Sequence, residues 1–517
     1  MMAFFQRLGK ALPQGLVLLA GLWLVLLLAL LTGFENAFSF AYRNGALLSN
    51  LRLLPLVFLF FALCLWAYFL RAKGRKLRPR PPLPRRRFLL LLCLGNGLLF
   101  LAQLVMVRSL WFFPAWDPQN CWETALQLAS GQPFTLGEYF QLCPNNAPLT
   151  LVLTGPMWVG LKLGLAEPFI LLPSLGAALM NLASLFTALS VERLTRSRPA
   201  TLFCYGLSTV FVLLSPYLSV PYTDSFSILF PSLSLYLFLT SLRPPLKWFL
   251  ISLSTALGAA IKPTVWIILV ALLMAEGLRL LASLPLGRGI VKRGLTAVLA
   301  LILGAAPGIG LEKAACVLLA GSTVPQGQLS ATHYLMLGMN AETYGGHSPA
   351  DVEYSLSFPT LAQRQQANIT RAWERLKDRG FLENVRFFAI KLYKAYHSGT
   401  FAFNGSFLPL EVPKRTDGLS LFLRSLYDGK GALNAVFCTV YQGIWLLILL
   451  LCALGLFLGC RRYPALPVIA LVLLGVSLYL MLFEVWPRYL FLYAPFFVAL
   501  ASLGMREVWS RVKPRSL

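Results

Sequence analysis

Apolar runs of membrane-spanning length alternate with short polar connections along most of the chain. About 20 consecutive apolar residues suffice to cross the hydrocarbon core of a bilayer as a helix. The pattern therefore predicts an all-α polytopic membrane protein with about twelve spans. The expected spans lie at about 15–33, 53–70, 88–107, 168–191, 200–218, 225–242, 247–261, 264–283, 295–319, 434–458, 463–485 and 489–505.

Two hydrophilic stretches, 108–146 and 320–433, interrupt this pattern and divide the chain into regions. Neither stretch alternates strand and helix patterns as a separate soluble catalytic domain would. The regions expected are N-terminal spans with a basic loop at 71–87, an external loop region, central spans, a second external region, and C-terminal spans with a basic tail: 1–107, 108–167, 168–319, 320–433 and 434–517.

Charge sets the expected orientation. The chain has 57% hydrophobic and 13% charged residues and a formal net charge of +25. The basic residues gather in short connections such as 71–87 and 192–198, which is the cytoplasmic bias of membrane proteins. Both termini are therefore expected in the cytoplasm of a cell-membrane protein, with 108–146 and 320–433 outside. The same distribution excludes nucleic acid as a partner.

The segment 147–165 is apolar enough to suggest another crossing. A crossing there would place the basic connections 192–198, 243–247 and 287–293 outside, against the charge bias. Pro148 and Pro156 also disfavour a straight membrane helix. We therefore expect a surface or re-entrant helix.

Within 108–146, a helix is expected from Asp117 to about Ser130, ending at Gly131. Asp is a good N-cap, and Gly suits a C-terminal stop. Trp122 and Ala125 fall on an apolar face opposite Glu123, so the helix should lie along the membrane surface. Cys121 and Cys143 share this loop, and a disulfide and two free thiols both remain open.

After Asp117 the loop continues to Tyr139-Phe140 and then Pro144-Asn145-Asn146. This order of motifs in the first large external loop resembles the GT-C glycosyltransferases, particularly protein mannosyltransferases and the bacterial lipid A aminoarabinose transferases. The resemblance implies a GT-C-like fold with amphipathic juxtamembrane helices. It also implies inverting transfer of a sugar from a polyprenyl-phosphate donor to an extracytoplasmic lipid, glycan or protein acceptor.

Sugar transfer needs a base for the acceptor and groups that stabilise the departing phosphate. Asp117 is the expected base, with a cap as its alternative role. Asp224 matches by order a second acidic residue of the resembled family, and it too has an alternative role as a cap. A divalent cation, Mg or Mn, bridging Asp117 and Asp224 is a further expectation that the sequence leaves open.

The expected substrate-binding residues come from several external segments. Arg488 and Lys262 lie at span ends and suit a phosphate, although snorkelling at the interface would also explain them. The stretch 331–351 resembles the same bacterial branch and carries His333, Asn340 and Asp351. The full set is Arg488, Lys262, His333, Asn340, Asp351, Tyr139 and Asn145.

Two further readings complete the expectations. Lys391, Lys394 and His397 follow an amphipathic external stretch; covering the site is one interpretation, and a solvated face is the favoured one. The rival function is a transporter or flippase for lipid-linked sugars or polymers. A transporter should show an internal repeat and ionisable residues near the middle of its spans. Here the notable charges lie at external span ends, which favours the enzyme.

Overall fold

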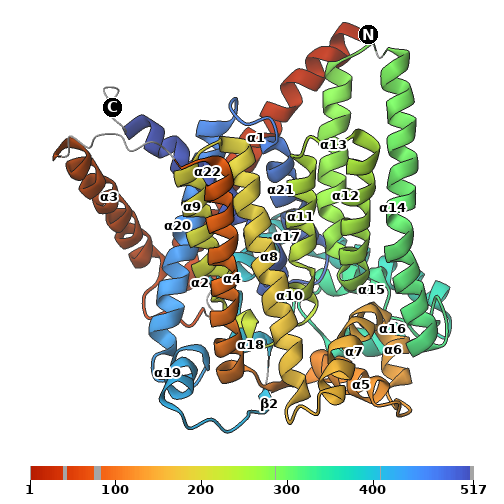
Figure 1. Ribbon diagram of the computed structural model, residues 1–517. Coiled ribbons are helices and arrows are strands. Elements are labelled where there is room, and N and C mark those ends of the chain that lie inside the picture. The colour runs from red at the N-terminus through yellow and green to blue at the C-terminus, as the bar shows by residue number, and fades with distance from the viewer. Residues whose placement is uncertain (1, 39–43, 75–82, 286, 408, 513–517) are drawn as a thin grey trace.

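The computed structural model describes residues 2–38, 44–74, 83–285, 287–407 and 409–512, and helices dominate it (Figure 1). The basic segment 75–82 and residues 513–517 of the basic tail lie outside the described residues. The helices are α1 (Met2–Gly33), α2 (Glu35–Phe38), α3 (Asn50–Gly74), α4 (Arg85–Leu110), α5 (Trp116–Ala129), α6 (Gly137–Leu142), α7 (Ala147–Lys162), α8 (Leu171–Thr195), α9 (Arg198–Ser208), α10 (Thr223–Ser227), α11 (Leu229–Phe238), α12 (Pro244–Ile261), α13 (Trp266–Ala282), α14 (Arg288–Ala320), α15 (Ala331–Gly338), α16 (Pro349–Leu356), α17 (Leu361–Tyr396), α18 (Phe403–Ser406), α19 (Gly418–Tyr427), α20 (Asn434–Gly459), α21 (Leu466–Leu482) and α22 (Ala494–Val512).

Short elements complete the fold. Phe113 and Pro114 of β1 pair antiparallel with β2. The strands, 3-10 turns and π-helical turn η3 are β1 (Phe113–Pro114), β2 (Pro409–Glu411), η1 (Pro144–Asn146), η2 (Pro168–Ile170), η3 (Thr209–Leu213), η4 (Pro216–Leu218), η5 (Pro263–Val265) and η6 (Pro487–Tyr493).

Within the described residues, nine helical segments are long and apolar enough to span a membrane. All twelve expected spans contain helix, but three fall short of that length. Two are the apolar segments Arg198–Leu213 and Leu466–Leu482. The third, 225–242, divides into α10 and α11, and the ten residues of α11 rise only about 15 Å. The nine segments are Phe4–Gly33, Asn50–Ala67, Arg85–Leu110, Pro168–Thr195, Pro244–Ile261, Pro263–Ala282, Gly289–Ala320, Asn434–Gly459 and Pro487–Val512.

Small residues bring the long helices close together. Gly304 and Gly308 of α14 lie so near α12 that a Cβ at either position would overlap the backbone of Phe249 or Ala256. Ser252 of α12 donates a hydrogen bond to the Leu301 carbonyl at 2.6 Å. Close approach at small residues, with polar groups bonding across, is how helices associate where lipid removes the hydrophobic driving force.

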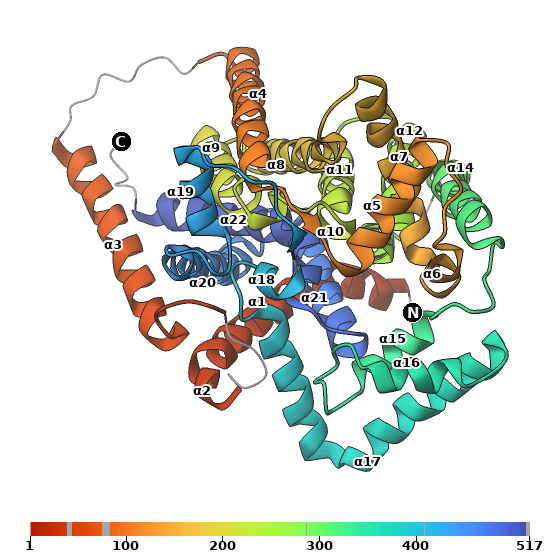
Figure 2. The same ribbon diagram turned by 90° about the horizontal axis from the view of Figure 1, so that it is seen from below.

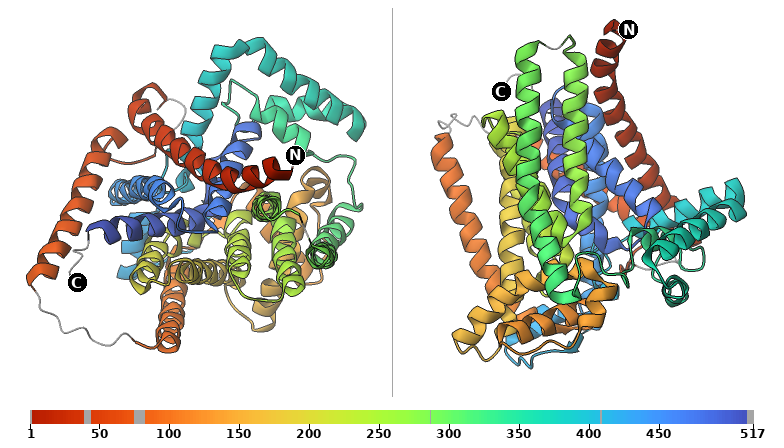
Figure 3. Two further views of the ribbon diagram at one scale, coloured as in Figure 1. Left: turned by 90° about the horizontal axis from the view of Figure 1, so that it is seen from above. Right: turned by 90° about the vertical axis from the view of Figure 1, so that its right-hand side faces the viewer.

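The two ends of the bundle differ. Figure 1 shows α5, α6, α7, α16 and α19 gathered at one end, which we call the α5 end. The start of α1, the end of α22 and the α13–α14 connection lie at the opposite end. The helix α7 lies beside α5 across the α5 end, in keeping with the expected non-crossing segment (Figures 1 and 3). Residues 108–146 and 320–433 thus flank one end of the bundle.

The helix α17 is bent into two arms that project sideways from the bundle (Figures 2 and 3). The bend lies at Gly380, whose φ of 69° and ψ of 177° break the helical geometry. The first arm packs on α15, and the second returns towards α21. The helix therefore joins the α15–α16 region to the core of the bundle.

Candidate functional site

The Asp117 cluster, defined as Asp117, Tyr139, Asn146 and Tyr222, lies at the α5 end. The expectation that Asp117 caps its helix is wrong. The helix begins at Trp116 with Ala115 as its N-cap, and no side chain caps it. Trp116 takes a φ of 63°, which is uncommon for a large side chain. This sharp entry places Asp117 in the first turn, half-buried, with its carboxylate free for other partners.

Two tyrosine hydroxyls hold that carboxylate. Tyr139 donates to Asp117 Oδ1 at 2.8 Å, and the Tyr222 hydroxyl lies 3.3 Å from Asp117 Oδ2. Asn146 closes the cluster, since its Nδ2 donates to the Tyr139 oxygen at 2.6 Å and its Oδ1 accepts from Tyr222 at 2.8 Å. Burial raises the pKa of Tyr139 and of Tyr222 well above the ordinary tyrosine range, so both remain proton donors at neutral pH.

The helix carrying Asp117 is anchored by its apolar face. Trp122 is fully buried and stacks on Phe169 at 5.9 Å, and Ala125 is also fully buried. The Gly131 stop is confirmed, because α5 ends at Ala129 and Gly131 has a φ of 73°. A rigid helix thus fixes the position of Asp117.

The two cysteines of this loop are free thiols. Burial raises the pKa of Cys143 to about 12 and that of Cys121 further. Both therefore stay protonated, and the disulfide alternative is not what the structure holds.

Asp224 and Lys262 form an ion pair beside the cluster. The Lys262 ammonium lies 2.6 Å from Asp224 Oδ1, and Asp224 is 1% exposed. The expected capping role of Asp224 is wrong, since the N-cap of α10 is Tyr222. Lys262 sits at the turn between α12 and η5, where burial lowers its pKa and the Asp224 carboxylate opposes that effect. The positive charge of Lys262 is thus paired with the Asp224 carboxylate inside the protein.

Arg488, in contrast, is surrounded by rings. Its guanidinium lies 5.3 Å from the Tyr222 ring centre, 5.4 Å from that of Tyr489 and 6.0 Å from that of Phe407. Its Nε is buried without a hydrogen-bond partner, and none of its nitrogens has an ion pair or hydrogen bond to a described residue. Cation–π contacts hold it in place while its fork of donors remains available.

Tyr222 joins these parts, because its hydroxyl meets Asp117 and its ring meets Arg488. Asp224 and Lys262 lie within electrostatic range of Arg488. Asp117, Asp224, Lys262, Arg488 and Tyr139 are therefore brought together at the α5 end.

Other members of this assembly were missed from sequence. Asn145 is exposed, and its expected substrate contact stays a prediction, whereas the neighbouring Asn146 bonds Tyr139 and Tyr222. Glu484 accepts a hydrogen bond from Tyr489 at 2.9 Å, and Lys262 lies over the Tyr489 ring. An aromatic and acidic composition before the last span was the available signal for Glu484.

The remaining expected residues, His333, Asn340 and Asp351, form a second group. Together with Arg375 and Ser355 we call it the Asp351 cluster. The Arg375 guanidinium binds both oxygens of Asp351, at 2.6 and 3.0 Å, and Asn340 donates to Asp351 at 2.8 Å. His333 bonds Ser355 at 2.7 Å. Burial lowers the pKa of His333 to about 4, so its ring is neutral. No hydrogen bond or ion pair between described residues links His333, Asn340 or Asp351 to Asp117 or Arg488.

The prediction that Lys391 and Lys394 form a solvated face of α17 is wrong. Lys391 is fully buried, and its ammonium donates to the carbonyls of Gly338, Met481 and Phe483 at 2.6–2.8 Å. Lys394 donates to the Thr343 carbonyl, and burial lowers its pKa to about 8. Lys391 thus joins the end of α15 to the end of α21 and the loop before Arg488. Lys394 bonds the loop after α15.

The residues present do not fit the expected divalent cation. Asp117 is held by hydroxyls, and Asp224 is neutralised by Lys262. Across the part of the chain that the structure describes, no group of three or more His, Cys, Asp or Glu side chains is placed to hold a metal.

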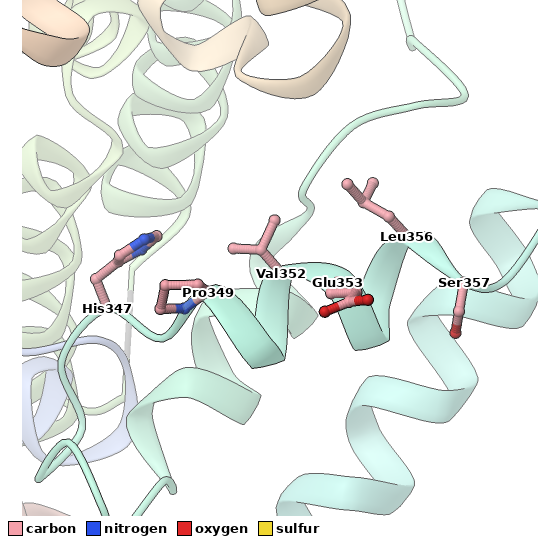
Figure 4. A pocket seen from close by; sticks show the side chains of 6 residues that line it. All are labelled: His347, Pro349, Val352, Glu353, Leu356 and Ser357. Carbon is pink, nitrogen blue, oxygen red and sulfur yellow. The ribbon is translucent and has the colours of Figure 1, made fainter.

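An open groove of about 580 Å³ runs along α16, apart from the Asp117 cluster. Figure 4 shows the side chains that line it. None of the expected site residues is among them: the lining is His347, Pro349, Val352, Glu353, Leu356 and Ser357.

Comparison with known proteins identifies one family. Neither a curated protein nor a solved structure matches it. A family model described as "Conserved hypothetical integral membrane protein" matches residues 21–509, which covers every candidate site residue. The chain therefore belongs to this family of integral membrane proteins.

Proposed function

We propose that the protein is a membrane glycosyltransferase of GT-C type that moves a sugar from a polyprenyl-phosphate donor to an acceptor at the α5 end. The observation that carries the proposal is that Asp117 and Arg488 both contact Tyr222, Asp117 at the hydroxyl and Arg488 at the ring. Among the described residues, no cation forms an ion pair with Asp117 and no acceptor bonds Arg488, and both residues lie beside Tyr222. Unpaired ionisable groups at membrane depth are costly and are typical of functional sites.

Each group suits one part of an inverting transfer. Asp117 takes the proton of the acceptor hydroxyl as its oxygen attacks the anomeric carbon, and the bond from that carbon to the phosphate oxygen breaks. Arg488 binds the departing polyprenyl phosphate through two parallel hydrogen bonds. Tyr139 and Tyr222 orient the carboxylate. Lys262 adds positive potential, weakened by its pairing with Asp224.

The sequence resemblance supports the same reading. Tyr139 and Asn146 belong to the motif that resembles the GT-C enzymes, and both belong to the hydrogen-bonded cluster around Asp117. The proposal puts this face outside the cell, in accordance with the basic connections at the opposite end. A lipid-borne donor and a water-borne acceptor would meet there.

The test is sugar transfer by purified protein in nanodiscs, using radiolabelled polyprenyl-phosphate hexoses and pentoses with cell-envelope acceptors. Asp117→Asn keeps the shape of the side chain but removes the base, so we expect a rate lower by about 10²–10⁴. Glu123→Gln is the matched control, because Glu123 lies on the same helix and bonds only Gln119 among described side chains. Its rate should stay within about threefold.

Full transfer by Asp117→Asn would exclude Asp117 as the base. Movement of a labelled lipid-linked sugar across the bilayer by the wild-type protein, without any transfer, would favour the transporter and exclude the enzyme.

A further inference from the structure

The bend of α17 presents large apolar side chains outwards. Phe381 is 80% exposed and Leu382 78%, and Val385 follows one turn later at 54%. On the first arm, Trp373 is 65% exposed and Ile369 46%. We call these five residues the α17 elbow.

These exposures match those of the spans. Leu98 of α4 is 69% exposed and Ile302 of α14 is 63%. The side chains on the spans face the hydrocarbon of the bilayer. A phenylalanine and a leucine side by side at 80% and 78% exposure would be unfavourable in water, and such patches mark a covering partner.

The bend is a built feature. Gly380 supplies the positive φ, and the helical bonds that it breaks are replaced locally. Asn384 donates to the freed Leu376 carbonyl at 2.6 Å and accepts from Arg379 Nε at 2.8 Å. Arg379 also stacks on Phe387 at 4.0 Å. The apolar tip is therefore held out rigidly.

Position identifies the covering partner. Both arms of α17 project sideways from the bundle near the α5 end, so the elbow continues the lipid-facing surface of the spans (Figures 2 and 3). Charged residues flank it in helical pairs, Arg371 with Glu374 and Arg386 with Glu383. A tryptophan and long charged side chains beside an apolar tip are the composition of an interfacial helix.

We infer that the α17 elbow inserts into the outer lipid leaflet and anchors the α15–α17 region to the membrane beside the bundle. Its occupant is the acyl region of the bilayer. The elbow thereby fixes the Asp351 cluster, through Arg375, and the loop before Arg488, through Lys391, at a constant depth. This inference stands without the proposed sugar transfer.

Lipid contact is measurable directly. In a protein with Cys64, Cys93, Cys143 and Cys460 changed to Ser, a spin label at Phe381→Cys or Leu382→Cys would be studied in phosphatidylcholine nanodiscs. Relaxation by oxygen reports lipid, and relaxation by a water-soluble nickel chelate reports water. Ile302→Cys is the lipid reference, and Gln132→Cys, at an exposed position of the loop after α5, is the water reference.

Labels at 381 and 382 should respond to oxygen as strongly as the label at 302 and be shielded from nickel. A response like that at 132 would overturn the inference. Shielding from both reagents would also overturn it, because a protein partner or a second copy would then cover the elbow.

A second variant separates lipid contact from internal packing. Phe381→Ser with Leu382→Ser should leave the Tm in detergent within about 2 °C of the wild-type value, because these side chains contact little of the protein. In nanodiscs the same variant should make a label at Trp373→Cys more accessible to nickel. A large loss of Tm in detergent, or unchanged nickel access, would contradict the inference.

Discussion

The Asp117 and Asp351 clusters each contain a carboxylate, but the partners of that carboxylate differ. In the Asp351 cluster, the carboxylate receives a two-pronged bond from Arg375 and another from Asn340, and His333 is bound by Ser355. Among the described residues, Asp117 bonds neutral tyrosine hydroxyls instead, and the neighbouring Arg488 contacts aromatic rings without an ion pair. The Asp351 carboxylate is thus neutralised within the protein, whereas Asp117 and Arg488 have no ion pair among the described residues.

The largest effect should come from breaking the closed cluster. Arg375→Met leaves Asp351 buried without its cation, and losing one partner of a buried pair costs about 3–5 kcal/mol of unfolding free energy. Arg371→Met is the control, because Arg371 and Glu374 are half exposed and 3.7 Å apart. An exposed pair contributes about 0–1 kcal/mol. Denaturant unfolding in detergent micelles measures both, and equal losses would remove the distinction.

A smaller effect concerns His333 and pH. Its folded pKa of about 4 lies below the unfolded value near 6.5, so the unfolded state binds a proton first as the pH falls. The stability contribution is complete above pH 6.5 and is lost towards pH 4, by at most about 3 kcal/mol. His333→Gln should show a flatter stability profile between pH 6.5 and 4. Identical profiles for the two proteins would contradict the buried neutral ring.

Next in size is Tyr222→Phe, which removes the hydroxyl between Asp117 and Asn146. Asn146 Oδ1 then loses a buried donor, at a cost of about 1–2 kcal/mol. The ring remains beside Arg488, so donor binding should persist while the transfer rate falls. Single-turnover assays with saturating donor separate the two effects, and an unchanged rate would deny Tyr222 its orienting role.

The sequence predicted the helical class and the position of α5, because apolar length and periodicity are local signals. The resemblance singled out Tyr139 as a substrate-binding residue, but its hydrogen bond to Asp117, 22 residues away in the chain, was not predicted. The inward role of Asn146 was missed, because two adjacent amides look alike until η1 and α7 turn one of them inwards.

Other misses arose from contacts between distant segments. The ion pair of Asp224 with Lys262 joins the short helix α10 to the end of α12, and neither segment of the sequence indicates the other. Lys391 looked solvated because its carbonyl partners lie 53, 90 and 92 residues away. Burial of a charge by distant backbone groups leaves no periodic trace in the sequence.

The central claim is that Arg488 is kept for a phosphate rather than for the fold. It is tested by titrating purified wild-type protein and Arg488→Met with a polyprenyl phosphate in detergent, and by comparing their unfolding. We expect the variant to bind about 10–100-fold more weakly, since a charge-assisted bond contributes about 1.5–3 kcal/mol, while its stability stays within about 1 kcal/mol of wild type or rises. Unchanged affinity for the lipid phosphate, or a stability loss as large as that of Arg375→Met, would contradict the account.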